Sequence, residues 1–354
     1  MKKVFLAIFV CLVTLTMVSS AFAVELWDWH LRGADEGLAA GALPPPGLYF
    51  INDFYWTGSW KQYTNGGEVQ APPVGATVKI SGYVDVPILL WNPGICPILG
   101  ATYAAAIAQP FDNATVRVIG TDLSGSQWGT YNTVIIPFIL SWEIPCDLHV
   151  AASFAVGLND GTTSPGDSLA ADPNSPFYHI YGNEGGFGQG PGRLLNKDGA
   201  IYAYSSSNNY SFTPTLGISW LYAGWNISAE FQYTFWTKDN DCEIQNGDEL
   251  AMDYTATYTC GKWTFGLGAE GEKQLYNDKG FYFPTAASLT PVYGKINNTC
   301  AVNWTAGPII GYNFGPCSLL FTYNFAIETK NDVGGDWAML RLVVPLGNPC
   351  DWYK

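Results

Sequence analysis

Residues 225–235 read WNISAEFQYTF, and this stretch decides the fold class. Its odd-numbered residues are all apolar or aromatic, whereas its even-numbered residues are Asn, Ser, Glu, Gln and Thr. Strict alternation with a period of two is typical of a β-strand whose two faces meet different surroundings. The pattern alone does not say whether the apolar face meets a protein core or lipid.

The same alternation returns along most of the chain. It predicts about twelve strands, near residues 47–62, 76–91, 101–119, 129–144, 146–159, 200–222, 225–238, 248–259, 262–276, 299–314, 317–329 and 336–347. Short turns such as Ala223-Gly224 alternate with longer polar connections. An up-and-down antiparallel meander closed into a barrel has one rim of tight turns and one rim of long loops.

The length and the chemistry of these strands favour a lipid-facing apolar side. A strand of about eleven residues is about 36 Å long and, tilted by about 45°, rises about 25 Å, the height of the apolar band on outer-membrane barrels. Between residues 210 and 344 no charged residue is in register with the aromatics. Aromatic residues gather beside the short turns, as in an interfacial girdle: Trp220, Tyr222, Trp225, Tyr258, Trp263 and Tyr312. We therefore expect an all-β transmembrane barrel rather than a secreted sandwich or a lipocalin-like barrel.

The N-terminus resembles a bacterial export signal. Lys2 and Lys3 precede an apolar run that ends at Ala21-Phe22-Ala23. This pattern predicts a signal peptide over residues 1–23, which is removed on the way to the bacterial outer membrane. The barrel is expected over residues 47–347, and a tail over 348–354 follows it.

Composition narrows the choice of partners. The net charge is −14, and only 13 % of the residues are charged. An acidic chain without basic clusters argues against nucleic acid and leaves membrane lipid and a small hydrophobic substrate as expected partners. The acidity itself fits solvated loops, with surface sites for divalent cations as the alternative. The sequence does not fix the oligomeric state.

Cysteine and histidine usage points away from metal or cofactor chemistry. There is no C-x-x-C pair, and the chain has only three histidines, so we expect no metal site and no cofactor. His149 and Ser153 share a strand face but stand about 13 Å apart, too far for a nucleophile and its base, so no catalytic residues are expected. Cysteines in short turns are candidates for disulfides (Cys96, Cys146, Cys260 and Cys317), as are Cys242 and Cys300 in the outer loops.

Three blocks resemble a known family. They are GLAAGALPPPGLYFINDFYWTGSW (37–60), FWTKDNDCEIQNGDELAMDYTATYTCGKWTFGLG (235–268) and LRLVVPL (340–346). The chain resembles the phenol meta-pathway degradation-like proteins, bacterial outer-membrane barrels related in role to fatty acid and aromatic hydrocarbon channels. The resemblance implies passive uptake of small hydrophobic, often aromatic, compounds. The resemblance assigns few functional roles to single residues, because the functional residues of the family are poorly defined. The stretch 160–208 and the C-terminal GNPCDWYK depart from the family pattern.

Ionisable residues on the polar strand faces are candidates for the lumen. They are Lys79, Asp85, Glu230, Asp253, Glu270, Glu272, Glu328 and Arg341. They would form either a polar path, with Arg341 paired to Glu328, or a network that fills a narrow barrel.

Two further segments are candidates for substrate contact. Residues 24–46 contain Trp27 and Trp29 and would be either a plug in the lumen or a periplasmic leader. The loop 175–192 would be a capture surface for apolar compounds or an ordinary surface loop. Its aromatic candidates are Phe177, Tyr178, Tyr181 and Phe187.

Three functions remain in competition at this point. The leading one is diffusion of small hydrophobic compounds through a gated barrel, and the alternatives are a general polar-solute porin and a structural or adhesive surface barrel. An apolar patch inside the barrel that is continuous with the plug and with the 160–208 loop would favour the first.

Overall fold

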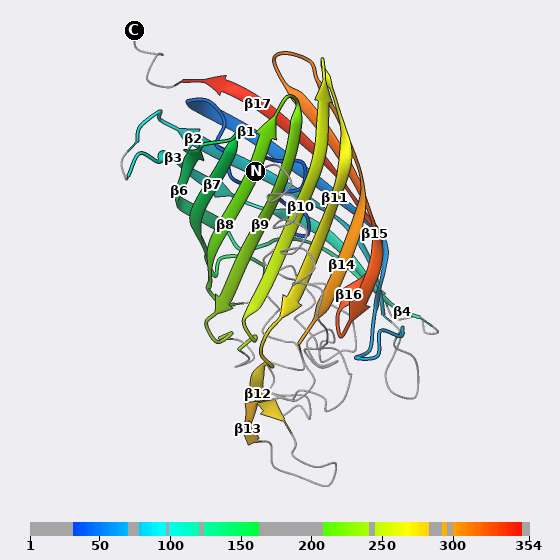
Figure 1. Ribbon diagram of the computed structural model, residues 1–354. Helices are drawn as coiled ribbons and strands as arrows, with labels where there is room; N and C mark the ends of the chain where they lie inside the picture. The colour runs from blue at the N-terminus through cyan, green and yellow to red at the C-terminus, as the bar shows by residue number, and fades with distance from the viewer. Residues whose placement is uncertain are drawn as a thin grey trace.

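A computed structural model describes residues 31–69, 78–96, 99–119, 124–162, 208–240, 245–282, 292–295 and 300–348. Twelve antiparallel strands close into a barrel, so the predicted fold class is confirmed. The chain runs around the barrel as a meander, and β1 closes it by pairing with both β2 and β17 (Figure 1). The strands of the closed barrel are β1 (Gly47–Gln62), β2 (Val78–Asn92), β3 (Thr102–Ala108), β6 (Val134–Ile144), β7 (Leu148–Gly157), β8 (Ser211–Tyr222), β9 (Trp225–Trp236), β10 (Glu249–Cys260), β11 (Trp263–Gln274), β14 (Val302–Asn313), β15 (Ser318–Lys330) and β17 (Trp337–Gly347).

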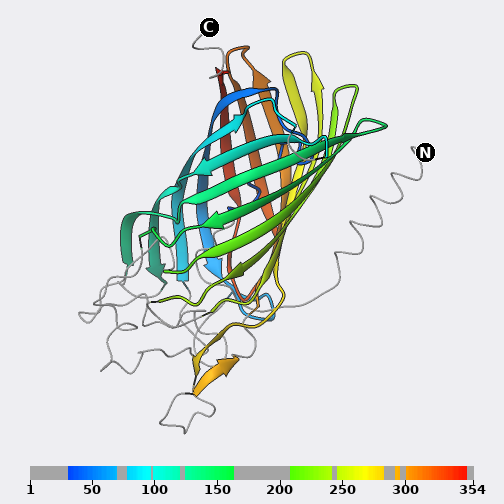
Figure 2. The ribbon, with the colours of Figure 1, turned by 90° about the vertical axis from the view of Figure 1, so that its left-hand side faces the viewer.

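Five shorter strands extend this barrel at the end that carries the longer connections. They are β4 (Phe111–Val118), β5 (Ser124–Thr130), β12 (Lys279–Tyr282), β13 (Val292–Lys295) and β16 (Val333–Gly334). The β12–β13 hairpin projects beyond this rim, while the tight turns lie at the opposite rim (Figures 1 and 2). In outer-membrane barrels the short turns are periplasmic and the long loops extracellular.

Residues 225–235 turn their polar face into the barrel and their apolar face outward, the reverse of a strand in a soluble protein. In β9 the polar residues Glu230 and Gln232 are only 8 % and 6 % exposed, whereas Trp225 and Phe235 are 45 % and 40 % exposed. The buried face of the strand is thus the polar one. The apolar face looks outward, as lipid requires. No helix among the described residues has the length and apolar character to span a bilayer.

Aromatic residues line the outside of the barrel next to the tight turns. Trp225 packs against Tyr258 with ring centroids 5.0 Å apart, and Trp263 packs against Tyr312 at 4.6 Å. Each pair joins neighbouring strands in register, because β9 pairs with β10 and β11 with β14. These contacts form a belt of the kind found at membrane interfaces.

One side of the barrel rises above the rest at the extracellular end. β4 and β5 continue the lines of β3 and β6 beyond Gly157, where β7 ends. We call the upper parts of β1 and β2 together with the β4–β5 hairpin the raised wall. Its inward residues are mainly apolar, since Ile80, Ala114 and Val116 are 0–2 % exposed, but Asp112 and Gln62 are also buried there, at 2 % and 5 %. Its outward residues are largely polar, the reverse of the pattern lower in the barrel.

No disulfide joins the candidate cysteines among the described residues, and Cys242 lies outside them. Cys96, Cys146, Cys260, Cys300 and Cys317 are all free thiols. The turns that carry Cys260 and Cys317 are separated by β11 and β14, which puts them roughly three strand spacings apart. That is about 14 Å, while a disulfide needs Cα atoms within about 7 Å.

Candidate functional site: the plugged lumen and its aromatic pocket

The chain that precedes β1 lies inside the barrel. It runs from Arg32, near the extracellular rim, down to Pro44, beside the tight turns. On the way the amide of Gly37 donates to Thr255 Oγ1 at 2.8 Å, and that of Gly41 donates to Ser219 Oγ at 2.7 Å. Asn92 Nδ2 donates to the carbonyl of Pro44 at 2.7 Å. We call residues 31–46 the plug, since side chains of several strands hold its backbone in the lumen.

Arg341 on β17 is the central anchor of the plug. Its guanidinium donates two hydrogen bonds of 2.7 Å to the two carboxylate oxygens of Asp53 on β1. It also donates to the plug carbonyls of Ala34 and, at 3.0 Å, Glu36. The side chain of Arg341 is 1 % exposed. A buried, bidentate pair of this kind fixes the position of both partners.

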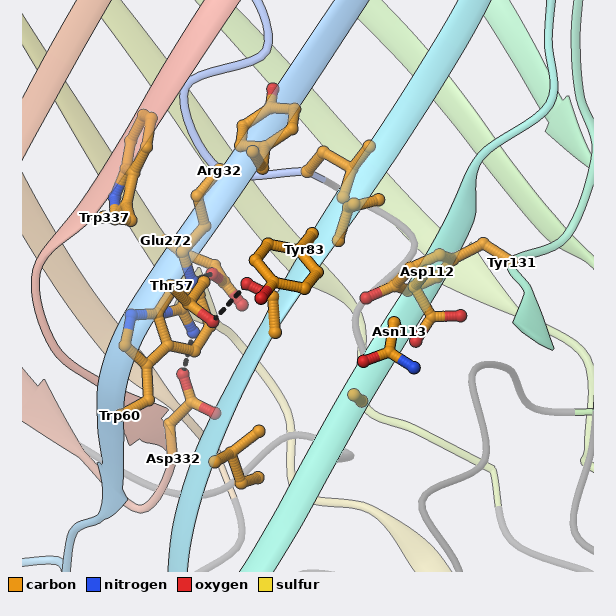
Figure 3. A pocket seen from close by; sticks show the side chains of 16 residues that line it. Arg32, Thr57, Trp60, Tyr83, Asp112, Asn113, Tyr131, Glu272, Asp332 and Trp337 are labelled. Carbon is orange, nitrogen blue, oxygen red and sulfur yellow. Dashed lines mark hydrogen bonds and ion pairs between the residues drawn. The ribbon is translucent and has the colours of Figure 1, made fainter. Parts of the chain in front are cut away.

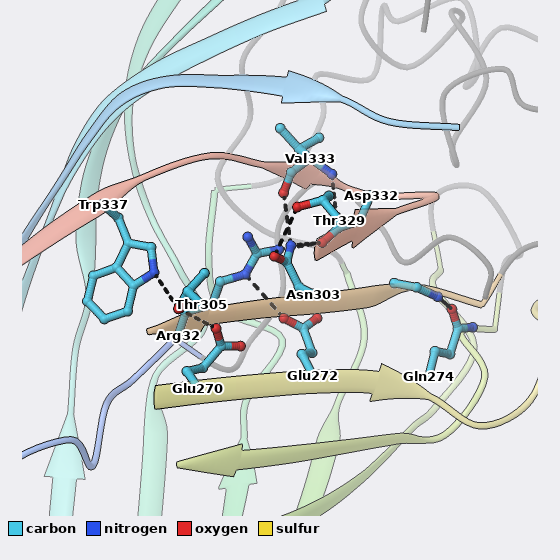
Figure 4. Close-up of polar contacts among 11 residues, drawn as sticks. Arg32, Glu270, Glu272, Gln274, Asn303, Thr305, Thr329, Asp332, Val333 and Trp337 are labelled. Carbon is cyan, nitrogen blue, oxygen red and sulfur yellow. Dashed lines mark hydrogen bonds and ion pairs between the residues drawn. The ribbon is translucent and has the colours of Figure 1, made fainter. Parts of the chain in front are cut away.

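Arg32 is the second anchor, at the upper end of the plug (Figure 4). Its Nε atom lies 3.2 Å from Glu272 Oε2, and its Nη2 atom pairs with Asp332. Asn303 Nδ2 donates to the same Asp332 carboxylate at 2.7 Å. Burial raises the pKa of Asp332, in the extracellular turn after β15, to about 6, against the opposing effect of Arg32. The guanidinium also lies over the ring of Trp60, 4.5 Å from its centroid, a cation–π contact.

Carboxylates outnumber cations around the plug. Glu36, Asp253 and Glu270 are 0–3 % exposed, and each has one carboxylate oxygen without a hydrogen-bond partner among the described residues. No group of three or more ligating side chains in the described ranges is arranged to hold a metal ion. The lumen is therefore a tightly occupied interior that is rich in carboxyl groups.

A pocket opens between the plug and the raised wall (Figure 3). It holds about 730 Å³ of empty space, including its open mouth. Its walls combine aromatic and aliphatic side chains with a few charged groups. They are formed by Leu31, Arg32, Tyr55, Thr57, Trp60, Ile80, Gly82, Tyr83, Val84, Asp112, Asn113, Ala114, Tyr131, Glu272, Asp332 and Trp337. Such a mixture is typical of sites for small hydrophobic ligands.

The aromatic wall of the pocket depends on a β-bulge in β1. Between Thr57 and Trp60 β1 advances three residues while β2 advances only two, from Gly82 to Ile80. The extra residue shifts the alternation by one. Trp60 thereby lies on the inner face with Tyr55, whose ring centroid is 5.8 Å from that of Trp337. The Tyr55 hydroxyl is buried and has no hydrogen-bond partner among the described residues.

The residues predicted for the lumen divide into two groups. Glu230, Asp253, Glu270 and Arg341 lie buried on the inner face, as does Glu272. Lys79 and Asp85 instead face outward, because the inner face of β2 carries its aliphatic residues Ile80, Val84 and Val86. Asp85 there accepts a 2.7 Å hydrogen bond from Asn52 Nδ2.

Glu328 also faces outward, so the expected Arg341–Glu328 pair is wrong. A bulge opposite Trp304 and Thr305 inserts one residue into β15, which turns Glu328 to the outer surface. It pairs there with Lys330. The loop and leader candidates lie outside the described residues: Trp27, Trp29, Phe177, Tyr178, Tyr181 and Phe187.

Several site residues were not singled out from the sequence. Asp53 is a lone carboxylate within the aromatic run LYFINDFYW of β1, and such an isolated charge was an available signal. Arg32 and Glu36 are charges in a segment whose placement the sequence left open. The inward orientation of Trp60 and Tyr131 could not be predicted from the sequence. A bulge in β1 sets the direction of Trp60, and the break between β5 and β6 sets that of Tyr131.

A known family matches the C-terminal part of the chain. Residues 196–342 match the family model described as "Putative MetA-pathway of phenol degradation". This stretch carries the family signature. The resemblance expected from the sequence is thus confirmed over β8 to β17, which include Arg341 and most of the carboxylates of the lumen. No curated protein matches the chain.

The solved structures that resemble this chain have little sequence identity with it, and the first of them shares its fold. An outer membrane channel from Pseudomonas putida F1 has a TM-score of 0.62 at 11 % identity, covering 86 % of this chain and 97 % of that one. The toluene transporter TbuX of Ralstonia pickettii has a TM-score of 0.41 at 10 % identity, covering 93 % and 95 %. The translocator domain of autotransporter NalP from Neisseria meningitidis scores 0.42 at 10 %, covering 84 % and 88 %. The barrel of this chain therefore shares the fold of the Pseudomonas putida F1 outer membrane channel.

Proposed function

We propose that this barrel is a channel through which small hydrophobic, aromatic compounds cross the outer membrane by passive diffusion. The observation that carries the proposal is the pocket between the plug and the raised wall. It presents the rings of Tyr55, Trp60 and Trp337 next to aliphatic side chains. Aromatic rings bind other rings by stacking and edge-to-face contact, and they bury large apolar areas.

The plug favours this function over a general porin. A porin for polar solutes needs a water-filled bore. Here the plug binds walls on different sides of the lumen, since Ser141 on β6 donates to the carbonyl of Gly41 at 2.7 Å, and Arg341 on β17 donates to Glu36. A hydrated solute would have to displace these contacts, whereas an apolar compound gains contacts when it enters the pocket.

The family and the fold support the same function. The matched family is described by its place in phenol degradation, and the Pseudomonas putida F1 structure is described as an outer membrane channel. The description of the Pseudomonas putida F1 structure is one of transport, and we assign the barrel no enzymatic role. Membrane lipid around the barrel and a small hydrophobic substrate inside it are the partners that follow.

Uptake into liposomes tests the proposal. We expect vesicles that contain the purified barrel to take up toluene faster than vesicles without protein, and to exclude a sugar of similar size. Trp60→Ala should lower toluene uptake, because it removes an aromatic wall of the pocket. Trp128→Ala is the matched control, since Trp128 is 74 % exposed on the raised wall and does not line the pocket. Equal entry of toluene and sugar would contradict the proposal.

A further inference from the structure

Three cations form a row across the raised wall. In the β1–β2 ladder Lys61 stands directly opposite Lys79, and in the β2–β4 ladder Lys79 stands directly opposite Arg117. Directly opposite residues have Cβ atoms about 4.5–5.5 Å apart and point to the same face of the sheet. The chain has only 16 Lys and Arg and a net charge of −14, so three adjacent cations are unexpected.

The row faces away from the barrel interior. Ile80 and Val116, the neighbours of Lys79 and Arg117 in sequence, are buried on the inner face at 2 % and 0 % exposure. Gln62, next to Lys61, is likewise buried at 5 %. Since successive residues of a strand point to opposite faces, all three cations lie on the outer surface.

None of the three cations forms an ion pair with another described residue. Like charges placed directly opposite one another destabilise a sheet. The three cations therefore repel one another, and no described residue on this face offsets the repulsion. Lys330, on the outer surface of neighbouring β15, shows the contrast because it pairs with Glu328. The row therefore has the charge and the geometry to accept an external anion.

The height of the row indicates which anion it meets. Trp56 and Tyr83 are register partners, 50 % and 47 % exposed, and belong to the outward aromatic surface. Lys79 lies four residues closer to the extracellular end of β2 than Tyr83. This separation is about 13 Å along the strand and about 9 Å along the membrane normal at a tilt of about 45°. Aromatic residues mark the membrane interface, and Lys and Arg side chains just beyond it reach the headgroup layer.

We propose that Lys61, Lys79 and Arg117 form a binding site for the phosphate group of an outer-leaflet lipid. The row below them adds neutral hydroxyl groups, since Ser81 and Thr115 are register partners on the same face. The hydroxyl of Thr115 donates to Ser126 Oγ at 3.0 Å. A phosphate offers several acceptor oxygens and a charge near −2, which matches a line of cations better than a single carboxylate does. This site is independent of the transport function proposed above.

Native mass spectrometry of the purified full-length barrel in a neutral detergent tests the site. The probes are lipid A, phosphatidylcholine and inorganic phosphate. We expect the wild type to retain lipid A and to release phosphatidylcholine. The variant Lys61→Gln, Lys79→Gln, Arg117→Gln should bind lipid A about a hundredfold more weakly, given the usual contribution of each cation near an anionic surface.

A second variant with the same change in net charge shows whether the position of the three cations, rather than their number, determines lipid A binding. Lys262→Gln, Lys279→Gln, Lys295→Gln removes as many cations, including the opposed pair Lys279 and Lys295 of the β12–β13 hairpin, and should keep wild-type affinity. Unchanged lipid A binding by the first variant, equal retention of phosphatidylcholine, or displacement of lipid A by equimolar phosphate would each overturn the proposal. Where the triple variant fails to fold, Lys79→Gln alone should weaken binding about fivefold, and unchanged affinity would overturn the proposal equally.

Discussion

Adjacent residues of a strand in this barrel meet opposite surroundings, because one faces outward and the next faces the lumen. Phe231 lies on the outer face of β9, where its ring meets that of Tyr254 edge-on at 6.2 Å. Gln232, the next residue, is buried in the lumen and donates to Asp35 at 3.2 Å and to Glu230 at 2.9 Å. One position along the chain thus separates lipid from a cluster of carboxylates.

The substitution of arginine at these two positions should have very different effects. Phe231→Arg places a cation in the apolar band, at a cost of about 2–4 kcal/mol near the bilayer midplane. Gln232→Arg places the same cation beside carboxylates. We expect the first variant to assemble poorly and the second to assemble well, as measured by the fraction of protein in the outer membrane that shows heat-modifiable mobility on gels. Equal assembly of the two variants would contradict the assigned orientation of β9.

Arg341 offers a second prediction at the residue scale. Arg341→Met should destabilise the barrel by about 3–5 kcal/mol, because it leaves the buried Asp53 carboxylate without its partner. It also releases the plug carbonyls of Ala34 and Glu36. Denaturant unfolding in micelles measures the first effect, and protease sensitivity of the plug measures the second. The double variant Arg341→Met, Asp53→Leu should recover much of the stability, since no unpaired charge remains. A single variant as stable as the wild type would show that the pair does not anchor the plug.

At the scale of elements, the plug is held by close backbone contact as well as by charge. A Cβ atom on Gly217 of β8 would lie 2.0 Å from the carbonyl oxygen of Ala40, so only glycine lets the plug approach this wall. Gly217→Val should displace the plug and raise the ion conductance of the barrel in planar bilayers, while the barrel still folds. Gly58→Val is the control, because a Cβ there would meet nothing closer than the Trp56 ring at 3.8 Å. Identical conductance of the two variants would indicate that the plug does not limit the lumen.

The orientation of some strands could be predicted from the sequence, whereas that of others could not. Strands such as β9 could be oriented in advance, because one face is wholly polar and the other wholly apolar. β2 could not, because its outward face carries Lys79 and Asp85 while its inward face is aliphatic, a reversal that follows from the raised wall. Glu328 was misplaced because a single inserted residue in β15 inverts the alternation beyond it, and bulges leave no clear mark in the sequence. The pocket depends on another such bulge, so its aromatic wall could not be foreseen.

At the scale of the whole molecule, the two rims should be accessible from different compartments. Cys146 and Cys260 are exposed in tight turns, whereas Asn65 is exposed in the connection between β1 and β2. A membrane-impermeant maleimide added to intact cells should label position 65 of an Asn65→Cys variant but neither Cys146 nor Cys260, as read by mass spectrometry of the peptides. After the outer membrane is permeabilised, the native thiols should also react. Labelling of Cys146 in intact cells would mean that the barrel is inserted the other way round.

The position of the plug also constrains how the protein is made. Residues 31–46 are continuous with β1, yet they lie within the ring that β1 completes through its ladders with β2 and β17. Once that ring is shut, the segment could enter only by threading past side chains that already fill the interior. The ring must therefore form around the segment, with the seam between the first and last strands sealed as a late event. Residues 31–46 would then already contact polar groups of distant strands when the wall closes.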